Sequence, residues 1–159
     1  MYQIGDRIVY PMHGAGIVED IEERQFLGES QRYLVVSLPL KHMKVMLPEK
    51  NVDTLGVRDV IRSDEVSGVI QVLSDVSGEM PGNWNRRYRD NMEKIKSGDI
   101  LEVARVVRNL THMDQLKGLS TGERKMLSDS RQILVSELLL ADESNEKVID
   151  VMIRNALAP

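Results

Sequence analysis

The first third of the chain alternates short apolar runs with turn residues, a pattern typical of a small antiparallel sheet. The runs with the length and composition of strands cover residues 7–10, 17–22, 33–38 and 43–47. Glycine, proline and polar residues separate them, as turns require. Four or five short strands within about fifty residues predict an SH3-like or Tudor-like β-barrel.

After Gly56 the apolar residues recur every three or four positions, which indicates amphipathic helices. The expected helices cover residues 63–75 and 84–96, begin at Asp99 and at Ser120, and finish with 145–156. Ser63 is the expected N-cap of the first, and capping boxes open the third and fourth. We therefore predict an α+β protein with a β domain over 1–56 and an all-α bundle of about five helices over 57–159, of which 57–62 form a linker.

The single tryptophan stands at the start of the second expected helix. Asn83 is a good N-cap, so Trp84 falls at the first helical position, where its own helix covers the ring only partly. Trp84 also shares a stripe with Tyr88, Met92 and Ile95 at spacings of four, four and three, and such stripes usually face the core. Spacing alone leaves both interpretations open: a packed core residue, or an exposed ring that contacts nucleic acid or protein.

Three arginines follow Trp84 within five residues, at Arg86, Arg87 and Arg89. An apolar ring beside guanidinium groups is suited to unstacked bases and the adjoining phosphates. The spacing also allows ion pairs one helical turn apart, from Arg86 to Asp90 and from Arg89 to Glu93. The arginines could therefore be either a DNA-binding cluster or an ordinary solvated face.

The net charge of −4 is unevenly distributed along the chain. Residues 1–56, 57–83 and 132–159 carry −2, −3 and −3, whereas 84–131 carry +4. The only positive block therefore begins at Trp84, and it could bind a polyanion in spite of the acidic total.

The sequence contains no recognisable catalytic or metal-binding motif. It has no cysteine, and its three histidines lack the spacing of a helical metal site. We expect no enzyme activity, no metal and no cofactor. The N-terminus has no signal-peptide pattern, and no apolar run approaches the roughly 18 residues of a membrane helix, so we expect a cytoplasmic protein without a membrane partner.

The β domain offers two ways to bind a partner. Its aromatic residues could form a cage for a cationic ligand; they are Tyr2, Tyr10, Phe26 and Tyr33. Alternatively, residues 43–47 could be an edge strand that pairs with a strand of a partner, since Lys44 and Pro48 are typical of edges. An interior strand fits the same pattern equally well.

Four blocks of the sequence resemble the CarD family of bacterial transcription regulators. They are GDRIVYP at 5–11 followed by His13-Gly14, GVRD at 56–59, NWNRRY at 83–88, and LSTGERKML at 119–127. The first block also looks like the RNA polymerase interaction domain of the transcription-repair coupling factor, but this chain has no ATPase motor.

The resemblance implies that a Tudor-like β domain pairs strands with the β subunit of RNA polymerase. The corresponding polymerase contacts are Arg24, Leu34, Met46 and Pro48. Some relatives have an arginine where this chain has Met46, so a salt bridge used there cannot form, and apolar contact must replace it.

The resemblance further implies that the helical domain meets promoter DNA without reading its sequence. The corresponding DNA contacts are Trp84, Arg86, Arg87, Arg89, Arg124 and Lys125. By this resemblance, Trp84 is expected to act as a wedge at the upstream fork of the transcription bubble and so to stabilise the open complex. A monomer is expected, and a strand-exchanged dimer is the alternative.

Two other functions remain as hypotheses. In the first, the protein is a polymerase-binding adaptor whose helical domain buries Trp84 and recruits another protein instead of DNA. In the second, it is a freestanding sequence-specific repressor, which the acidic net charge disfavours.

Overall fold

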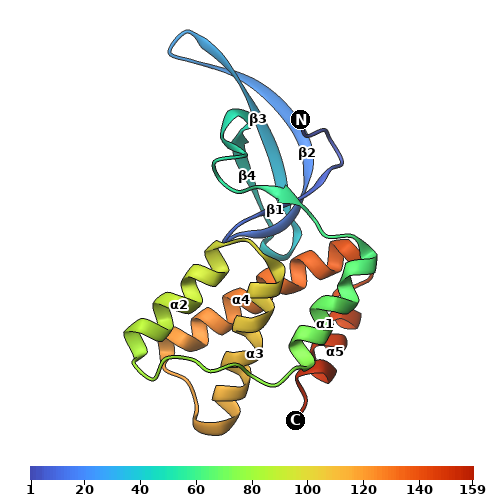
Figure 1. The fold of residues 1–159 in the computed structure, drawn as a ribbon. Coiled ribbons are helices and arrows are strands. Elements are labelled where there is room, and N and C mark those ends of the chain that lie inside the picture. Colours follow the sequence, from blue (N-terminus) through green and yellow to red (C-terminus); the bar gives the residue numbers. More distant parts are fainter.

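The computed structural model describes all of residues 1–159 and shows a five-stranded antiparallel sheet followed by five α-helices (Figure 1). The predicted α+β class is confirmed. The strands are β1 (Arg7–Tyr10), β2 (Gly14–Phe26), β3 (Glu29–Leu38), β4 (Met43–Pro48) and β5 (Arg58–Asp59). They lie in the order β4-β3-β2-β1-β5, so β4 and β5 are the two edges of the sheet.

The predicted barrel is not closed. Closure would require the edges to pair, but β5 has only two residues, and these pair with Ile8 and Val9 of β1. Strands β2 and β3 instead continue as a long hairpin that projects away from the helices (Figure 1). Leu27 and Gly28 close this hairpin with positive φ angles of 52° and 79°, as a two-residue type I′ turn requires.

The β domain has its own small core on one face of the sheet. Its buried residues are Ile8, Val18, Leu34, Val36, Leu38, Leu47 and Val57. Most lie at alternate positions of their strands, because successive side chains of a strand point to opposite faces. This core includes Leu47 and therefore holds the edge strand β4 in place.

The helices are α1 (Val66–Ser74), α2 (Trp84–Lys96), α3 (Ile100–Lys117), α4 (Thr121–Asp142) and α5 (Glu146–Leu157). The side chains of Asn83, Asp99, Ser120 and Asn145 cap the last four, each accepting a hydrogen bond from a backbone N–H two or three residues further on. Ser63 is not the N-cap of α1, because it begins a 3-10 turn that precedes this helix. The predicted span 84–96 of the second helix is confirmed.

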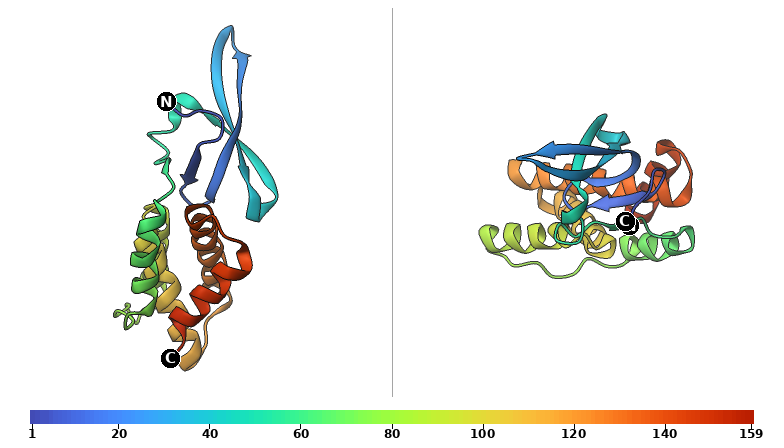
Figure 2. Two further views of the ribbon diagram at one scale, coloured as in Figure 1. Left: turned by 90° about the vertical axis from the view of Figure 1, so that its right-hand side faces the viewer. Right: turned by 90° about the horizontal axis from the view of Figure 1, so that it is seen from above.

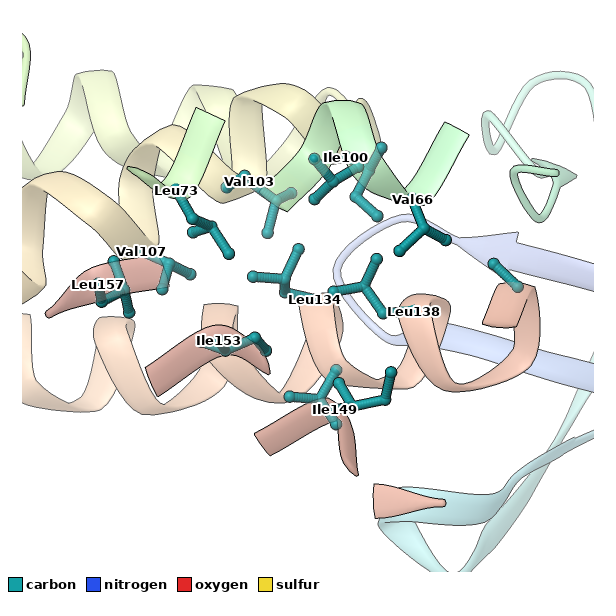
Figure 3. Close-up of a cluster of buried hydrophobic side chains, with 14 residues drawn as sticks. Val66, Leu73, Ile100, Val103, Val107, Leu134, Leu138, Ile149, Ile153 and Leu157 are labelled. Atoms are coloured by element: carbon teal, nitrogen blue, oxygen red, sulfur yellow. The ribbon is translucent and has the colours of Figure 1, made fainter. Parts of the chain in front are cut away.

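The main hydrophobic core lies between α1, α3, α4 and α5 (Figure 3). Leu134 and Leu138 of α4 are fully buried at its centre. Helix α2 packs outside this core in a second cluster, where Ile95 meets Val106 and Met126. None of the helices combines the length and the apolar character that a membrane crossing requires.

The two domains are packed against each other. Arg58 donates two hydrogen bonds, of 2.6 and 2.7 Å, to the Glu137 carboxylate of α4. The backbone N–H of Ala15 donates to Ser136 Oγ at 2.9 Å. The predicted linker 57–62 thus contains both strand β5 and an ion pair between the domains. Figure 2 shows the sheet seated at one end of the helical bundle.

Helix α2 has its C-terminal end at the contact with the sheet and its N-terminal end away from the sheet. At its C-terminal end Gly98 has a φ of 74°, and a Cβ there would lie 2.9 Å from Cγ of Pro11. The β1–β2 turn therefore seats directly on the end of α2. The N-terminal end of α2, which carries Trp84, lies away from the sheet (Figure 1).

Candidate nucleic-acid interface

Trp84 is the first residue of α2, and 41% of its surface is exposed. The Asn83 side chain accepts a 3.1 Å hydrogen bond from the N–H of Arg86, so the helix has a capped start. Tyr88 and Met92 are half-buried, and Ile95 is buried. The predicted stripe is therefore core at one end of the helix and surface at the other.

The indole ring of Trp84 is held by three neighbours. Its Nε1–H donates a 2.9 Å hydrogen bond to Ser120 Oγ at the start of α4. Tyr88 stacks on it with ring centroids 5.0 Å apart and an interplanar angle of 19°. Gly122 lies at its edge, where a Cβ would come 3.4 Å from Cζ2. The ring is thus exposed in part but fixed in orientation.

Arg87 does not point to solvent. Its side chain is 8% exposed, and its Nε and Nη2 donate to the Glu123 carboxylate at 2.7 and 3.1 Å. Nη1 donates to the carbonyls of Pro81 and Gly82, both at 3.2 Å. The hydrogen bond with Glu123 raises the pKa of Arg87 and lowers the pKa of Glu123. This burial and pairing disfavour a contact between Arg87 and a DNA phosphate, and that contact stays a prediction.

The buried face of α2 is formed by Arg87, Asn91 and Ile95. These residues are four positions apart, so they do lie on one face of the helix. The sequence pattern does not predict this buried face, because two of its three residues are polar. The spacing of four from Ile95 was the signal that could have identified it.

Arg86 and Arg89 are exposed, and neither forms an ion pair. The ion pairs expected one turn away, with Asp90 and Glu93, are absent. The predicted ion pairs are therefore not formed, although both arginines do lie on a solvated face. Their guanidinium groups are free to bind an anion.

Helix α4 brings a second pair of cations to the same end of the molecule. Arg124 and Lys125 lie exposed in its first turns. Arg124 donates to the carbonyl of Leu119 at 3.3 Å, and Lys125 pairs with Asp129 at 2.9 Å. Lys125 and Tyr88 line one groove between α2 and α4. The first two turns of α2 and of α4 therefore carry Trp84 and four exposed cationic side chains.

A second exposed feature is the edge strand β4. The interpretation of residues 43–47 as an edge is confirmed, and the interior alternative is wrong. Met43 and Met46 are 45% and 39% exposed. Lys44 reaches across the sheet to Glu19, 2.6 Å away, and Pro48 ends the strand. The outer side of β4 has no strand beside it.

The other residues expected to bind polymerase are placed differently. Arg24 is exposed and pairs with Glu22 at 3.0 Å on the projecting hairpin. Leu34 is fully buried in the core of the β domain, on a strand that has neighbours on both sides. Leu34 pairs with Leu47 of β4 in the sheet. Its burial disfavours a direct contact with polymerase, and that contact stays a prediction.

The aromatic residues of the β domain do not form a cage. Tyr2 and Tyr10 pack against the β-domain core, and Tyr10 stacks on His13 with centroids 4.3 Å apart. Phe26 is 62% exposed at the end of the hairpin. No three histidine, aspartate or glutamate side chains gather as a metal site would require.

Comparisons with known proteins place the chain in a class, the transcription regulators. The family model described as CarD-like/TRCF RID domain matches residues 2–61, and the model described as CarD, C-terminal domain matches residues 68–154. The chain is also 40% identical over 149 residues to a protein of Bacillus subtilis (strain 168) named "Putative transcription factor YdeB". The match covers 94% of this chain and 97% of that relative. The chain belongs to the CarD family.

Proposed function

We propose that the protein docks on the β subunit of RNA polymerase through the edge strand β4 and stabilises the open promoter complex with Trp84. The observation that carries this proposal is an exposed, oriented tryptophan at the start of a helix that also carries two exposed arginines without ion pairs, in a chain with a free strand edge. The protein is expected to prefer the open complex, because the fork of the bubble exposes bases that are already unstacked. An aromatic ring can contact these bases without the free-energy cost of unstacking them.

Docking is supported by the geometry of β4. A free edge offers a row of backbone N–H and C=O groups to a partner strand, and alternate side chains supply selectivity. Met43 and Met46 are exposed on this strand, and methionine adapts to irregular apolar surfaces. The match of residues 2–61 to the CarD-like/TRCF RID domain supports polymerase as the partner.

DNA binding is supported by four exposed cations near the starts of α2 and α4, which are Arg86, Arg89, Arg124 and Lys125. If each neutralises one phosphate, the slope of log K against log salt is roughly −3.6. Four contacts of this kind give weak binding without sequence preference. Docking on polymerase compensates for this weak DNA affinity, because a tethered DNA-binding site experiences an effective DNA concentration on the order of mM.

The stabilisation works through a difference in affinity between two states. A ligand shifts an equilibrium only by its preference for one state over the other, so Trp84 must contact open DNA better than closed DNA. A preference of about 1.4 kcal/mol changes the ratio of open to closed complexes tenfold at saturation. No nucleotide hydrolysis is needed.

Open-complex lifetime tests the proposal in a reconstituted system with purified polymerase and a promoter fragment. Trp84→Ala should bind polymerase with unchanged affinity and lose the lengthened lifetime, while Trp84→Phe should keep part of it. Val148→Ala, at an exposed site of α5, is the matched control and should behave like the unaltered protein. An unchanged lifetime for Trp84→Ala at saturation would refute the wedge and favour the adaptor.

A further inference from the structure

We infer that Ser120, together with Tyr88 and Gly122, forms a seat that holds the indole of Trp84 in the orientation required to stack on DNA. The inference rests on the proposed function and adds positioning residues to it. None of the three was expected from the sequence to act at the interface. Ser120 was expected only to cap a helix, and Tyr88 only to pack.

The hydroxyl of Ser120 is fully engaged and has one geometry available. It accepts the Nε1–H of Trp84 at 2.9 Å and the backbone N–H of Glu123 at 3.2 Å. It donates to Glu123 Oε1, also at 3.2 Å. The Glu123 carboxylate is itself fixed by Arg87. A continuous chain of hydrogen bonds therefore runs from the buried ion pair to the exposed indole.

Tyr88 and Gly122 complete the seat by contact. Tyr88 covers one face of the indole. Gly122 is the second residue of α4. A Cβ at this position would lie 3.4 Å from Cζ2 of Trp84 and 3.8 Å from Cε2 of Tyr88. Both distances are ordinary van der Waals contacts, so the backbone of α4 at Gly122 lies close to both rings.

The seat determines which part of the ring is presented to a ligand. Nε1 and the Cζ2 edge face α4, and one face lies on Tyr88. The opposite face is left for a base, which would continue a stack that begins with Tyr88. A ring already held in place loses less freedom on binding. Immobilising a side chain of this size is equivalent to about two- to tenfold in affinity.

Ser120→Gly tests this role, because glycine is nearly as good an N-cap as serine but has no hydroxyl. We expect the open-complex lifetime to fall about two- to tenfold, and Ser120→Thr to restore it. In a Trp84→Phe background the same change should have no effect, because phenylalanine has no N–H to hold. An equal loss in both backgrounds, or no loss in either, would overturn the inference.

Fluorescence of the single tryptophan in the free protein separates this inference from the proposed function. Ser120→Gly should lower the anisotropy of Trp84, because the ring gains local motion. Asn145→Gly removes the capping side chain of α5, remote from Trp84, and should change neither anisotropy nor lifetime. Unchanged anisotropy in Ser120→Gly would refute the inference that Ser120 holds the indole. The proposed role of Trp84 in the open complex would still be tested separately by Trp84→Ala. If Trp84→Ala shortens the open-complex lifetime, the proposed function holds even when the inference about Ser120 fails.

Discussion

Replacing Arg87 by methionine should destabilise the protein strongly, whereas the same replacement of its neighbour Arg86 should not. Arg87 is 8% exposed and Glu123 2% exposed at the side chain, so methionine would leave a buried carboxylate without its partner. Breaking a buried ion pair in this way costs about 3–5 kcal/mol. For a domain of this size each kcal/mol lowers the melting temperature by about 2–4 °C. The expected decrease is therefore roughly 6–20 °C.

Thermal unfolding followed by circular dichroism, with urea unfolding in parallel, measures this difference. Arg86→Met is the matched control, since Arg86 is exposed and has no ion-pair partner. It should melt within about 2 °C of the unaltered protein, because surface changes of this kind are usually within about 0.5 kcal/mol. If Arg87→Met melted normally and weakened DNA binding as much as Arg86→Met, then Arg87 would be a DNA contact after all.

The remaining predictions concern pH, salt and docking. Arg87 lowers the pKa of Glu123 in the folded state, so this carboxylate contributes stability that is present above the unfolded value of about 4.3 and is lost as pH falls through the folded pKa. Glu123→Gln should therefore make the free energy of unfolding less pH-dependent on the acid side in urea titrations. Arg86→Gln with Arg89→Gln should reduce the salt slope of DNA binding by about 1.8, measured by fluorescence anisotropy from low to moderate salt; an unchanged slope would remove both from the interface. Met46→Glu should weaken polymerase binding in a pull-down titration without lowering the melting temperature, since Met46 is 39% exposed on β4.

The order and type of the first four strands and of the five helices followed from the sequence, because local rules specify them, whereas strand β5 lies in the segment predicted to be a linker. Asn83 marked the start of α2, and the break at Gly98 marked its end. The long β2–β3 hairpin was underestimated. Its outer half is exposed on both faces, so it lacks the alternation of apolar and polar residues by which a half-buried strand is recognised.

The site was predicted less completely, because it depends on contacts between distant segments. In the run Arg86-Arg87 only the spacing of four from Asn91 and Ile95 sets Arg87 apart, and its buried partner Glu123 lies on a distant segment. Glu123 was expected to complete a capping box with Ser120, and its second role toward Arg87 arises only when α2 and α4 pack together. For the same reason the hydrogen bond from Trp84 to Ser120 has no local sequence signal.

The sheet and the helical bundle contact each other directly, which affects how the two domains can act together. Two modules joined by a flexible linker would search for DNA independently after docking. Arg58 instead binds Glu137 across the interface, and Gly98 seats Pro11. The distance from β4 to Trp84 is therefore set by the fold, so docking at one end determines where the other end reaches.

Photocrosslinking from position 84 tests the central claim most directly. A benzophenone amino acid placed there should crosslink to DNA at the upstream fork in open complexes formed with polymerase. It should not do so in closed complexes trapped at low temperature or with DNA alone at the same salt concentration. Crosslinking to another protein in place of DNA, or equal crosslinking to closed and open complexes, would contradict the proposal that Trp84 stabilises the open state.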